Sequence, residues 1–214
     1  MKITWLGHSA VHLEGKANIL IDPFLSQNPA ATAKPEDFQN VRAVVVTHGH
    51  DDHLGDSFQI CRQTGATLVA VFEIASAAAA QGLKTEPMNV GGTVSVGEVK
   101  VSMVPAFHSG SAAGVVIELD GRRIYHAGDT GLTLEMQLIG EMFRPDIAFL
   151  PIDGRFNMTP RLAAKAVELL KVPRAVPIHY DTFPAIASSP GEFKRLAGRR
   201  AEIIILKPGE SLQL

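Results

Sequence analysis

The chain has 214 residues, of which 46% are hydrophobic and 20% are charged, a composition typical of a folded globular protein that excludes a disordered chain. Its formal net charge is −2 and its longest basic cluster is Arg199-Arg200, so a large nucleic acid is not expected as a partner. With one cysteine, no signal-peptide pattern and no segment near the ~20 apolar residues that span a bilayer, the sequence predicts a cytoplasmic protein that does not enter membranes.

The first part of the chain predicts short strands that end at polar residues. Three strands are expected over residues 2–6, 10–14 and 17–22, separated by turns. Residues 24–40 contain Pro, Ala and Asn and are predicted to form a surface loop. Residues 41–46 form a near-continuous β-branched run, which predicts a strand covered on both faces.

The middle and the end of the chain alternate between helical and extended patterns. A helix over residues 56–64, a strand over 67–71 and an Ala-rich helix over 73–81 are expected first. Consecutive strands follow at 93–96, 99–105, 114–119 and 122–126, the last two joined by the hairpin signal Asp120-Gly121. The remaining predicted elements are a helix at 132–142, a strand at 146–151, a helix at 160–170, a strand at 174–178, a short helix at 191–196 and a strand at 202–206.

The two halves of the chain resemble each other weakly. In each half, a strand that ends at an Asp is followed by a connection and then by an apolar strand that ends at polar residues. Two similar halves, each with several strands and outer helices, predict two sheets packed face to face with helices outside, which is a four-layer αββα sandwich of the α/β class. No linker or change in composition divides the chain, so we expect one domain over residues 1–214.

A dense group of polar residues follows the predicted strand at 41–46. This segment holds three histidines and two carboxylates within six residues, in the order Thr47-His48-Gly49-His50-Asp51-Asp52-His53, and Gly49 permits a tight backbone. Metal ions need several imidazoles or carboxylates that converge at about 2.0–2.2 Å, and a strand-to-helix loop can supply them. The alternative is a solvated loop with accidental histidines. The H-x-H-x-D-H spacing favours the metal interpretation.

Three further strand ends carry residues of the same kind. His108 follows the strand at 99–105, Asp129 follows the strand at 122–126, and His179 follows the strand at 174–178. A single histidine at a strand end is more often structural than a ligand. Together, however, the three give the one-ligand-per-loop pattern of catalytic metal sites, which leaves coordination positions open for water and substrate.

The order of these motifs resembles the metallo-β-lactamase superfamily, and the resemblance spans nearly the whole chain. The motifs Leu6-Gly7-His8-Ser9, Ile21-Asp22-Pro23 and His179-Tyr180-Asp181-Thr182-Phe183-Pro184 narrow it to a compact branch of metal-dependent hydrolases that is similar to the ascorbate-6-phosphate lactonases. The resemblance implies two divalent metal ions per chain. It implies a first ion held by His48, His50 and His108, a second held by Asp52, His53 and His179, and a bridging ligand, Asp129. Asp22 then supports the metal loop from outside the ligand set.

The implied activity is that of a metal-dependent hydrolase. A hydroxide that bridges the two ions would attack a small ester, lactone or phosphodiester, with Asp52 and Asp129 as catalytic residues that offset metal charge and orient the nucleophile. Zinc suits the histidine-rich ligands, but manganese or iron also binds mixed imidazole and carboxylate sets. The expected partners are a small-molecule substrate and a second copy of the chain in a homo-oligomer.

Two other functions fit the same fold. One is a sensor that binds metal or ligand without turnover, and the other is a redox diiron protein. Seven ligands exceed the four of a closed structural site, and no flavin or electron-delivery segment is present, so hydrolysis is favoured.

Three residues keep open roles. His8 would orient substrate, donate a proton or form a structural hydrogen bond, and His126 would support the metal site or pack in the core. Asp153 stands where the resembled branch usually has a small residue, and it would alter the charge of the pocket or hydrogen-bond a loop.

Overall fold

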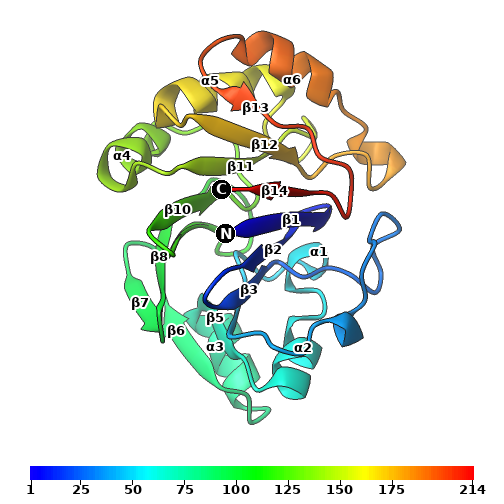
Figure 1. Cartoon of the computed structure of the whole chain (residues 1–214), viewed down its shortest axis with the longest axis vertical. Coiled ribbons are helices and arrows are strands. Elements are labelled where there is room, and N and C mark those ends of the chain that lie inside the picture. The colour runs from blue at the N-terminus through cyan, green and yellow to red at the C-terminus, as the bar shows by residue number, and fades with distance from the viewer.

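Two seven-stranded sheets stand face to face at the centre of the protein, in a computed structural model that describes residues 1–214 (Figure 1). The strand order of the first sheet is β14-β1-β2-β3-β4-β5-β6. Its strands are β1 (Lys2–Gly7), β2 (Ala10–Glu14), β3 (Asn18–Ile21), β4 (Ala43–Val45), β5 (Thr67–Val71), β6 (Thr85–Met88) and β14 (Ser211–Gln213).

The second sheet repeats this plan with the order β13-β12-β11-β10-β9-β8-β7. Its strands are β7 (Thr93–Val96), β8 (Val99–Pro105), β9 (Ala113–Leu119), β10 (Arg122–His126), β11 (Ile147–Pro151), β12 (Arg174–Ile178) and β13 (Glu202–Ile203). In each sheet a group of antiparallel strands continues into a group of parallel ones, the change falling at β3 in the first sheet and at β10 in the second. The internal resemblance of the two halves therefore corresponds to a repeated topology.

Helices cover the outer face of each sheet (Figure 1). The helices α2 (Ser57–Thr64) and α3 (Phe72–Ala79) pack on the first sheet, and α4 (Glu135–Phe143), α5 (Pro160–Leu170) and α6 (Pro190–Ala197) lie on the second. One turn of helix, α1 (Asp51–Leu54), follows β4, and the 3-10 turns η1 (Pro35–Asp37) and η2 (Pro184–Ile186) lie in loops. The predicted four-layer αββα sandwich is confirmed. None of the helices has both the length and the apolar character needed to cross a bilayer.

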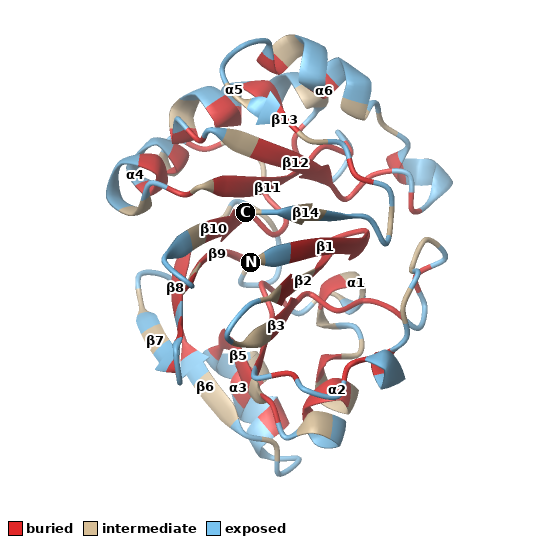
Figure 2. Cartoon of the chain, in the orientation of Figure 1, coloured by how far each residue is buried: buried red, intermediate tan, exposed pale blue.

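The central strands of the first sheet are buried on both faces, as Figure 2 shows. In β3, Ile19 and Ile21 belong to a core of 46 buried residues between the sheets and beneath α4 to α6, whereas Leu20 belongs to a core of 14 residues beneath α2 and α3. Alternate residues of a strand point to opposite faces, so the apolar residues of the near-continuous run at 41–46 also divide between the two cores.

Strand direction determines where the polar strand ends lie. In the first sheet β1, β3 and β4 run in one direction, and in the second sheet β8, β10, β11 and β12 do so. The residues that follow the carboxyl ends of these strands are therefore delivered to one end of each sheet. The predicted metal-binding residues all belong to this set of connections.

The sequence patterns missed two edge strands. β6 contains Pro87, which cannot donate a backbone hydrogen bond and is tolerated because it lies at the edge of its sheet. β14 has three residues and pairs with β1 across almost the whole length of the chain, so no local signal announces it. The predicted helix at 132–142 begins three residues later, and the predicted strand at 202–206 ends at Ile203.

The packing of α4 on α5 gives a test of this architecture. A Cβ atom added at Gly140 would overlap the carbonyl oxygen of Leu170 and lie 2.9 Å from its Cα. Gly140→Ala should therefore lower the free energy of unfolding by about 1–3 kcal/mol through overpacking. Gly191→Ala is the matched control, because the nearest atom to its new methyl group is Ser189 Oγ at 3.9 Å. If the two variants had equal midpoints of thermal unfolding, the close approach of α4 to the end of α5 would be contradicted.

Candidate metal centre

The loop that follows β4 is held by the buried carboxylate of Asp22. This residue follows β3 in a left-handed backbone conformation with φ 46°. Its Oδ1 accepts a hydrogen bond from the Thr47 backbone N–H at 2.8 Å, and its Oδ2 accepts one from the Thr47 hydroxyl at 2.6 Å. Asp22 Oδ2 also lies 2.7 Å from His53 Nδ1. One carboxylate therefore fixes both ends of the loop that contains His48, His50 and Asp52.

A second anchor fixes the loop that contains Asp129. His126, at the end of β10, donates from Nε2 to the Ser9 carbonyl at 2.9 Å, and its Nδ1 accepts from the Gly128 N–H at 3.1 Å. Gly128 has a φ of 60°, and a Cβ there would lie 2.8 Å from the Ala113 carbonyl oxygen. His126 is fully buried, and its two hydrogen bonds show that it supports the loop of Asp129 from within the core.

These anchors bring the seven predicted metal-binding residues together. His48 Nε2 lies 3.0 Å from His50 Nδ1, and the ring of His108 lies 5.3 Å from that of His48. Asp129 Oδ1 lies 3.2 Å from His53 Nε2. Asp129 Oδ2 lies 3.3 Å from His179 Nε2 and 3.5 Å from His108 Nε2.

The ligand atoms form three overlapping groups. Within each group they all lie within 4.8 Å of one another, which is close enough to share an ion. The groups are His48, His50 and His108; His48, His53 and Asp129; and His8, Asp52, His53 and His179. His8, whose role the sequence left open, joins the third group. The sequence feature that pointed to His8 was the turn at Gly7-His8-Ser9 after the first strand.

The hydrogen bonding of the cluster tests whether it fits a metal. His53 Nε2, Asp129 Oδ1 and His179 Nε2 are all buried, and none has a hydrogen-bond partner, although they lie within 3.2–3.3 Å of atoms in the cluster. A buried polar atom without a partner is costly and rare in folded proteins. Coordination of divalent cations would satisfy these atoms. The donor set therefore fits metal binding.

The charge balance of the cluster supports the same conclusion. Burial alone would raise the pKa of Asp129, but the neighbouring His53 and His179 overcome this effect and hold the pKa well below its usual range. Burial would lower the pKa of His53, but Asp129 and Asp22 raise it to about 10. Burial lowers the pKa of His48 to about 3, so its imidazole is neutral, as a metal ligand must be. The buried carboxylates thus require positive charge at this place.

Asp153 hydrogen-bonds a loop, which was one of its two sequence-based roles. Its Oδ1 accepts from the backbone N–H groups of Arg155 at 2.8 Å and Phe156 at 2.7 Å, and its Oδ2 accepts from Asn157 Nδ2 at 2.7 Å. Oδ2 also lies 3.2 Å from His179 Nδ1. Asp153 therefore orients the far side of the His179 ring.

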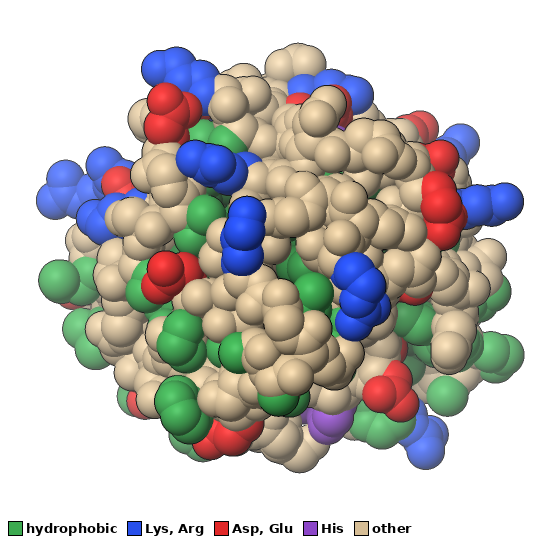
Figure 3. Space-filling model, turned by 90° about the horizontal axis from the view of Figure 1, so that it is seen from below, with side chains coloured by type: hydrophobic (Ala, Val, Ile, Leu, Met, Phe, Trp, Pro, Cys, Tyr) green, Lys and Arg blue, Asp and Glu red, His purple; other side chains and the backbone are tan.

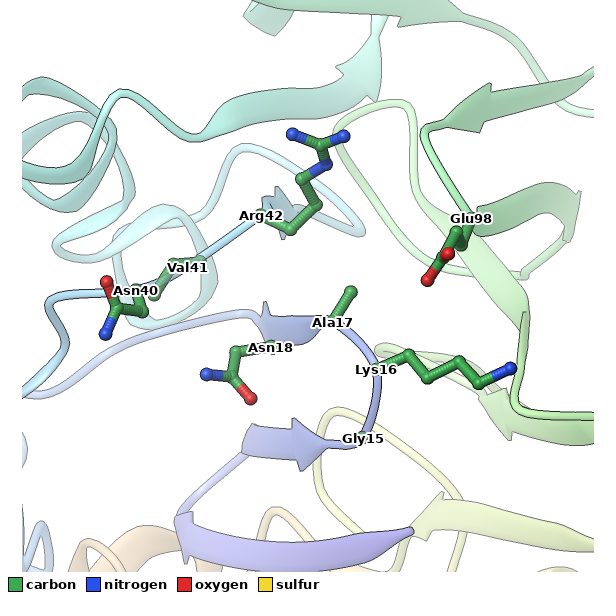
Figure 4. Close-up of a pocket in the computed structure, with 8 residues that line it drawn as sticks. All are labelled: Gly15, Lys16, Ala17, Asn18, Asn40, Val41, Arg42 and Glu98. Carbon is green, nitrogen blue, oxygen red and sulfur yellow. The ribbon is translucent and has the colours of Figure 1, made fainter.

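The opposite end of the first sheet has no comparable cluster. A cavity of about 450 Å³ there is lined by eight residues from the β2–β3 turn, the segment before β4 and the β7–β8 turn (Figure 4). Lys16 and Arg42 point in different directions in this cavity, and Glu98 is its only carboxylate. On the face seen in Figure 3, the Lys and Arg side chains are separated by uncharged surface and form no continuous basic patch.

Comparison with known proteins places these features in a family. The family model for the Beta-lactamase superfamily domain matches residues 17–180. A UPF0173 metal-dependent hydrolase of Pyrococcus furiosus is 51% identical over the full length of both chains. The solved structure of Igni18, a metallo hydrolase from Ignicoccus hospitalis, is 38% identical, with a TM-score of 0.93 over 99% of this chain and 97% of that one.

A more distant neighbour shares the fold alone. The diiron β-hydroxylase CmlA from Streptomyces venezuelae is 17% identical, with a TM-score of 0.78 over 100% of this chain and 54% of its own. The four-layer sandwich is thus the metallo-β-lactamase fold that the sequence predicted.

The role of Asp22 can be tested by its removal. Asp22→Ala leaves Thr47 and His53 without their acceptor, so metal affinity should fall about 10–100-fold, the usual effect of losing a group that orients metal ligands. Asp56→Ala is the matched control, because Asp56 also accepts three hydrogen bonds but holds the loop at Leu25 and Ser26. Zinc titration against a competing chelator measures both variants. Equal affinities would reduce Asp22 to a purely structural residue.

Proposed function

Because the chain belongs to the metal-dependent hydrolases of the beta-lactamase superfamily, we propose that it binds two divalent ions in the cluster around Asp129 and hydrolyses a small ester, lactone or phosphodiester. In this proposal the first ion is held by His48, His50 and His108, the second by Asp52, His53 and His179, and both by Asp129.

The position of Asp129 carries the proposal. Its two oxygens face different histidines, with Oδ1 beside His53 and Oδ2 between His108 and His179. Asp129 therefore lies beside histidines of both proposed ligand sets, His108 of the first ion and His53 and His179 of the second. Its side chain is 3% exposed, so the charge of this carboxylate needs compensation from within the cluster.

Bound divalent ions supply Lewis acidity, because they lower the pKa of a coordinated water toward ~7 and polarise the oxygen of the scissile group. The histidine-rich set favours zinc, whereas the carboxylates also suit manganese or iron. The number and identity of the ions are therefore the first quantities to measure.

Asp52 and Asp129 have different tasks in this proposal because their environments differ. The Asp52 side chain is 35% exposed, far more than that of Asp129, so water and substrate reach it. The nearby His179, whose Nε2 lies 3.7 Å from Asp52 Oδ2, and the hydrogen bond with His8 outweigh the effect of burial and lower the pKa of Asp52, which keeps it ionised. Asp52 would help to hold the second ion and orient the attacking water, and Asp129 would offset positive charge between the ions.

The surroundings of the cluster favour an uncharged, partly apolar substrate. A cavity of about 280 Å³ is lined by Phe107, Leu132, Thr133, Leu134 and Glu135, and it contains no Lys or Arg. It adjoins the cluster, because Phe107 precedes His108 and its N–H donates to the Thr130 hydroxyl at 2.9 Å. A negatively charged group in this cavity would meet Glu135 with no Lys or Arg beside it. An ester or a lactone is therefore the favoured substrate class.

The predicted homo-oligomer has support from exposed apolar residues of α4 and its N-cap. Leu134, which caps the start of α4, and Leu138 and Met142 within it are spaced four residues apart and are 60–76% exposed. Exposed apolar side chains grouped on one helix face are typical of subunit contacts.

Metal removal and a substrate panel test the function directly. The purified protein should contain close to two transition-metal ions per chain and hydrolyse at least one member of a panel made of uncharged lactones, uncharged esters and anionic phosphodiesters. Activity should vanish with the metal in excess chelator and return with zinc or manganese. Turnover after confirmed metal loss would exclude the mechanism. Two bound ions without hydrolysis, but with oxygen-dependent chemistry, would favour the redox alternative.

Asp129→Asn tests the bridging position. The neutral amide cannot offset two dications, so one ion should be lost or bound more weakly while the fold survives on its buried strands. Turnover should fall by far more than metal content, because the chemistry depends on both ions.

Asp146→Asn provides the matched control for this substitution. Asp146 lies just before β11, at the end of this strand that is far from the cluster. It accepts a hydrogen bond from the Arg123 N–H at 2.8 Å. Metal analysis, thermal unfolding and rate measurements apply to both variants. If Asp129→Asn still binds two ions and turns over substrate as fast as Asp146→Asn does, the assignment of Asp129 as the bridge is wrong.

A further inference from the structure

His8 is a buried histidine at the metal cluster that the proposed ligand sets do not use. It lies in the turn between β1 and β2, is 1% exposed, and adopts a left-handed backbone with φ 54°. We infer that His8 is a positioning residue, which donates a hydrogen bond from Nε2 to Asp52 and thereby orients this carboxylate toward the second metal position. The inference rests on the proposed two-metal function and deepens it.

The contact with Asp52 defines the donor. His8 Nε2 lies 3.1 Å from Asp52 Oδ2, and this is the only hydrogen bond that the Asp52 side chain makes. An ionised carboxylate can only accept, so the proton of this bond belongs to His8 Nε2. Carboxylates that ligate metals are themselves held by hydrogen bonds, and Asp52 has no other donor for this purpose.

Thr182 fixes the tautomer of His8. The Thr182 hydroxyl lies 2.8 Å from His8 Nδ1 and makes no other hydrogen bond. A neutral imidazole with its proton on Nε2 has a lone pair on Nδ1, so the hydroxyl donates to the ring. The result is a directed chain of hydrogen bonds from Thr182 through His8 to Asp52. It links the loop after β12 to α1.

The backbone of His8 reinforces this link. Its carbonyl accepts a hydrogen bond from Trp5 Nε1 at 3.0 Å and another from the His179 N–H at 2.9 Å. The rings of His8 and His179 lie 4.0 Å apart between centroids. One residue therefore sets the positions of both Asp52, from the first half of the chain, and His179, from the second.

Two other roles for His8 would require features that its surroundings do not provide. As a metal ligand, His8 would need a lone pair on this atom, which the hydrogen bond to Asp52 excludes. As a proton donor to substrate, it would need access to substrate, whereas its ring is packed against Phe24 and Phe183. Positioning of Asp52 needs neither a free lone pair nor exposure.

Paired substitutions separate these roles. In His8→Gln the amide can still donate to Asp52 while its oxygen accepts from Thr182, whereas His8→Leu removes both bonds. His8→Leu should lower the affinity for the second ion about 10–100-fold, and His8→Gln should restore most of it. Zinc titration against a competing chelator gives the affinities. Equal loss in both variants would make His8 a ligand and overturn the inference, as would wild-type affinity in both.

A spectroscopic measurement tests the inference independently of turnover, and its first part needs only the wild-type protein. Nitrogen-15 spectra of the wild-type protein, without metal and with zinc, should show His8 as the neutral tautomer with hydrogen on Nε2. Thr182→Val should increase the population of the other tautomer and weaken binding of the second ion. A proton on Nδ1 in the wild-type protein would refute the inference. A protein that shows the expected tautomer but binds no zinc would instead refute the proposed function alone.

Discussion

Buried negative charge where the two sheets meet is the constraint on which the site depends. Asp22 is fully buried and Asp129 nearly so, and an ionised carboxylate in such surroundings is unfavourable unless opposite charge or hydrogen-bond donors surround it. His53 lies between them, with Nδ1 2.7 Å from Asp22 and Nε2 3.2 Å from Asp129. Because these carboxylates are buried, they need positive charge beside them, and the loop from Thr47 to His53 is held in place by the hydrogen bonds of Asp22.

The repeated topology explains how this charge is assembled. The first half of the chain contributes Asp22 and the loop from His48 to His53, and the second half contributes His108, Asp129 and His179, each at the carboxyl end of a strand. Neither half holds a complete set of ligand atoms. The cluster forms only when the sheets pack face to face, so the core between the sheets also sets the distances in the site.

Much of this could be predicted from local patterns, and the rest depends on contacts between distant residues. The apolar run of β5 and the alternation of apolar and polar residues in β8 are patterns that periodicity identifies, and H-x-H-x-D-H is a compact signal. By contrast, β6 contains a proline, and β14 gains its identity only by pairing with β1. The contact of His8 with Thr182 joins residues 174 positions apart, and nothing near either residue announces it. The three histidines around Asp129 likewise meet through topology alone.

The backbone of the site carries a consequence for how the protein can be stabilised. His8, Asp22 and His179 all adopt left-handed conformations, with φ between 46° and 55°. This region disfavours residues with a Cβ by roughly 1 kcal/mol, and glycine enters it freely. Glycine at these three positions would relax the main chain and at the same time remove the imidazoles and the carboxylate that the cluster needs. At His8 and Asp22 the strained main chain is held by the hydrogen bonds that these same side chains make, so the strain and the chemistry of the site cannot be separated at these turns.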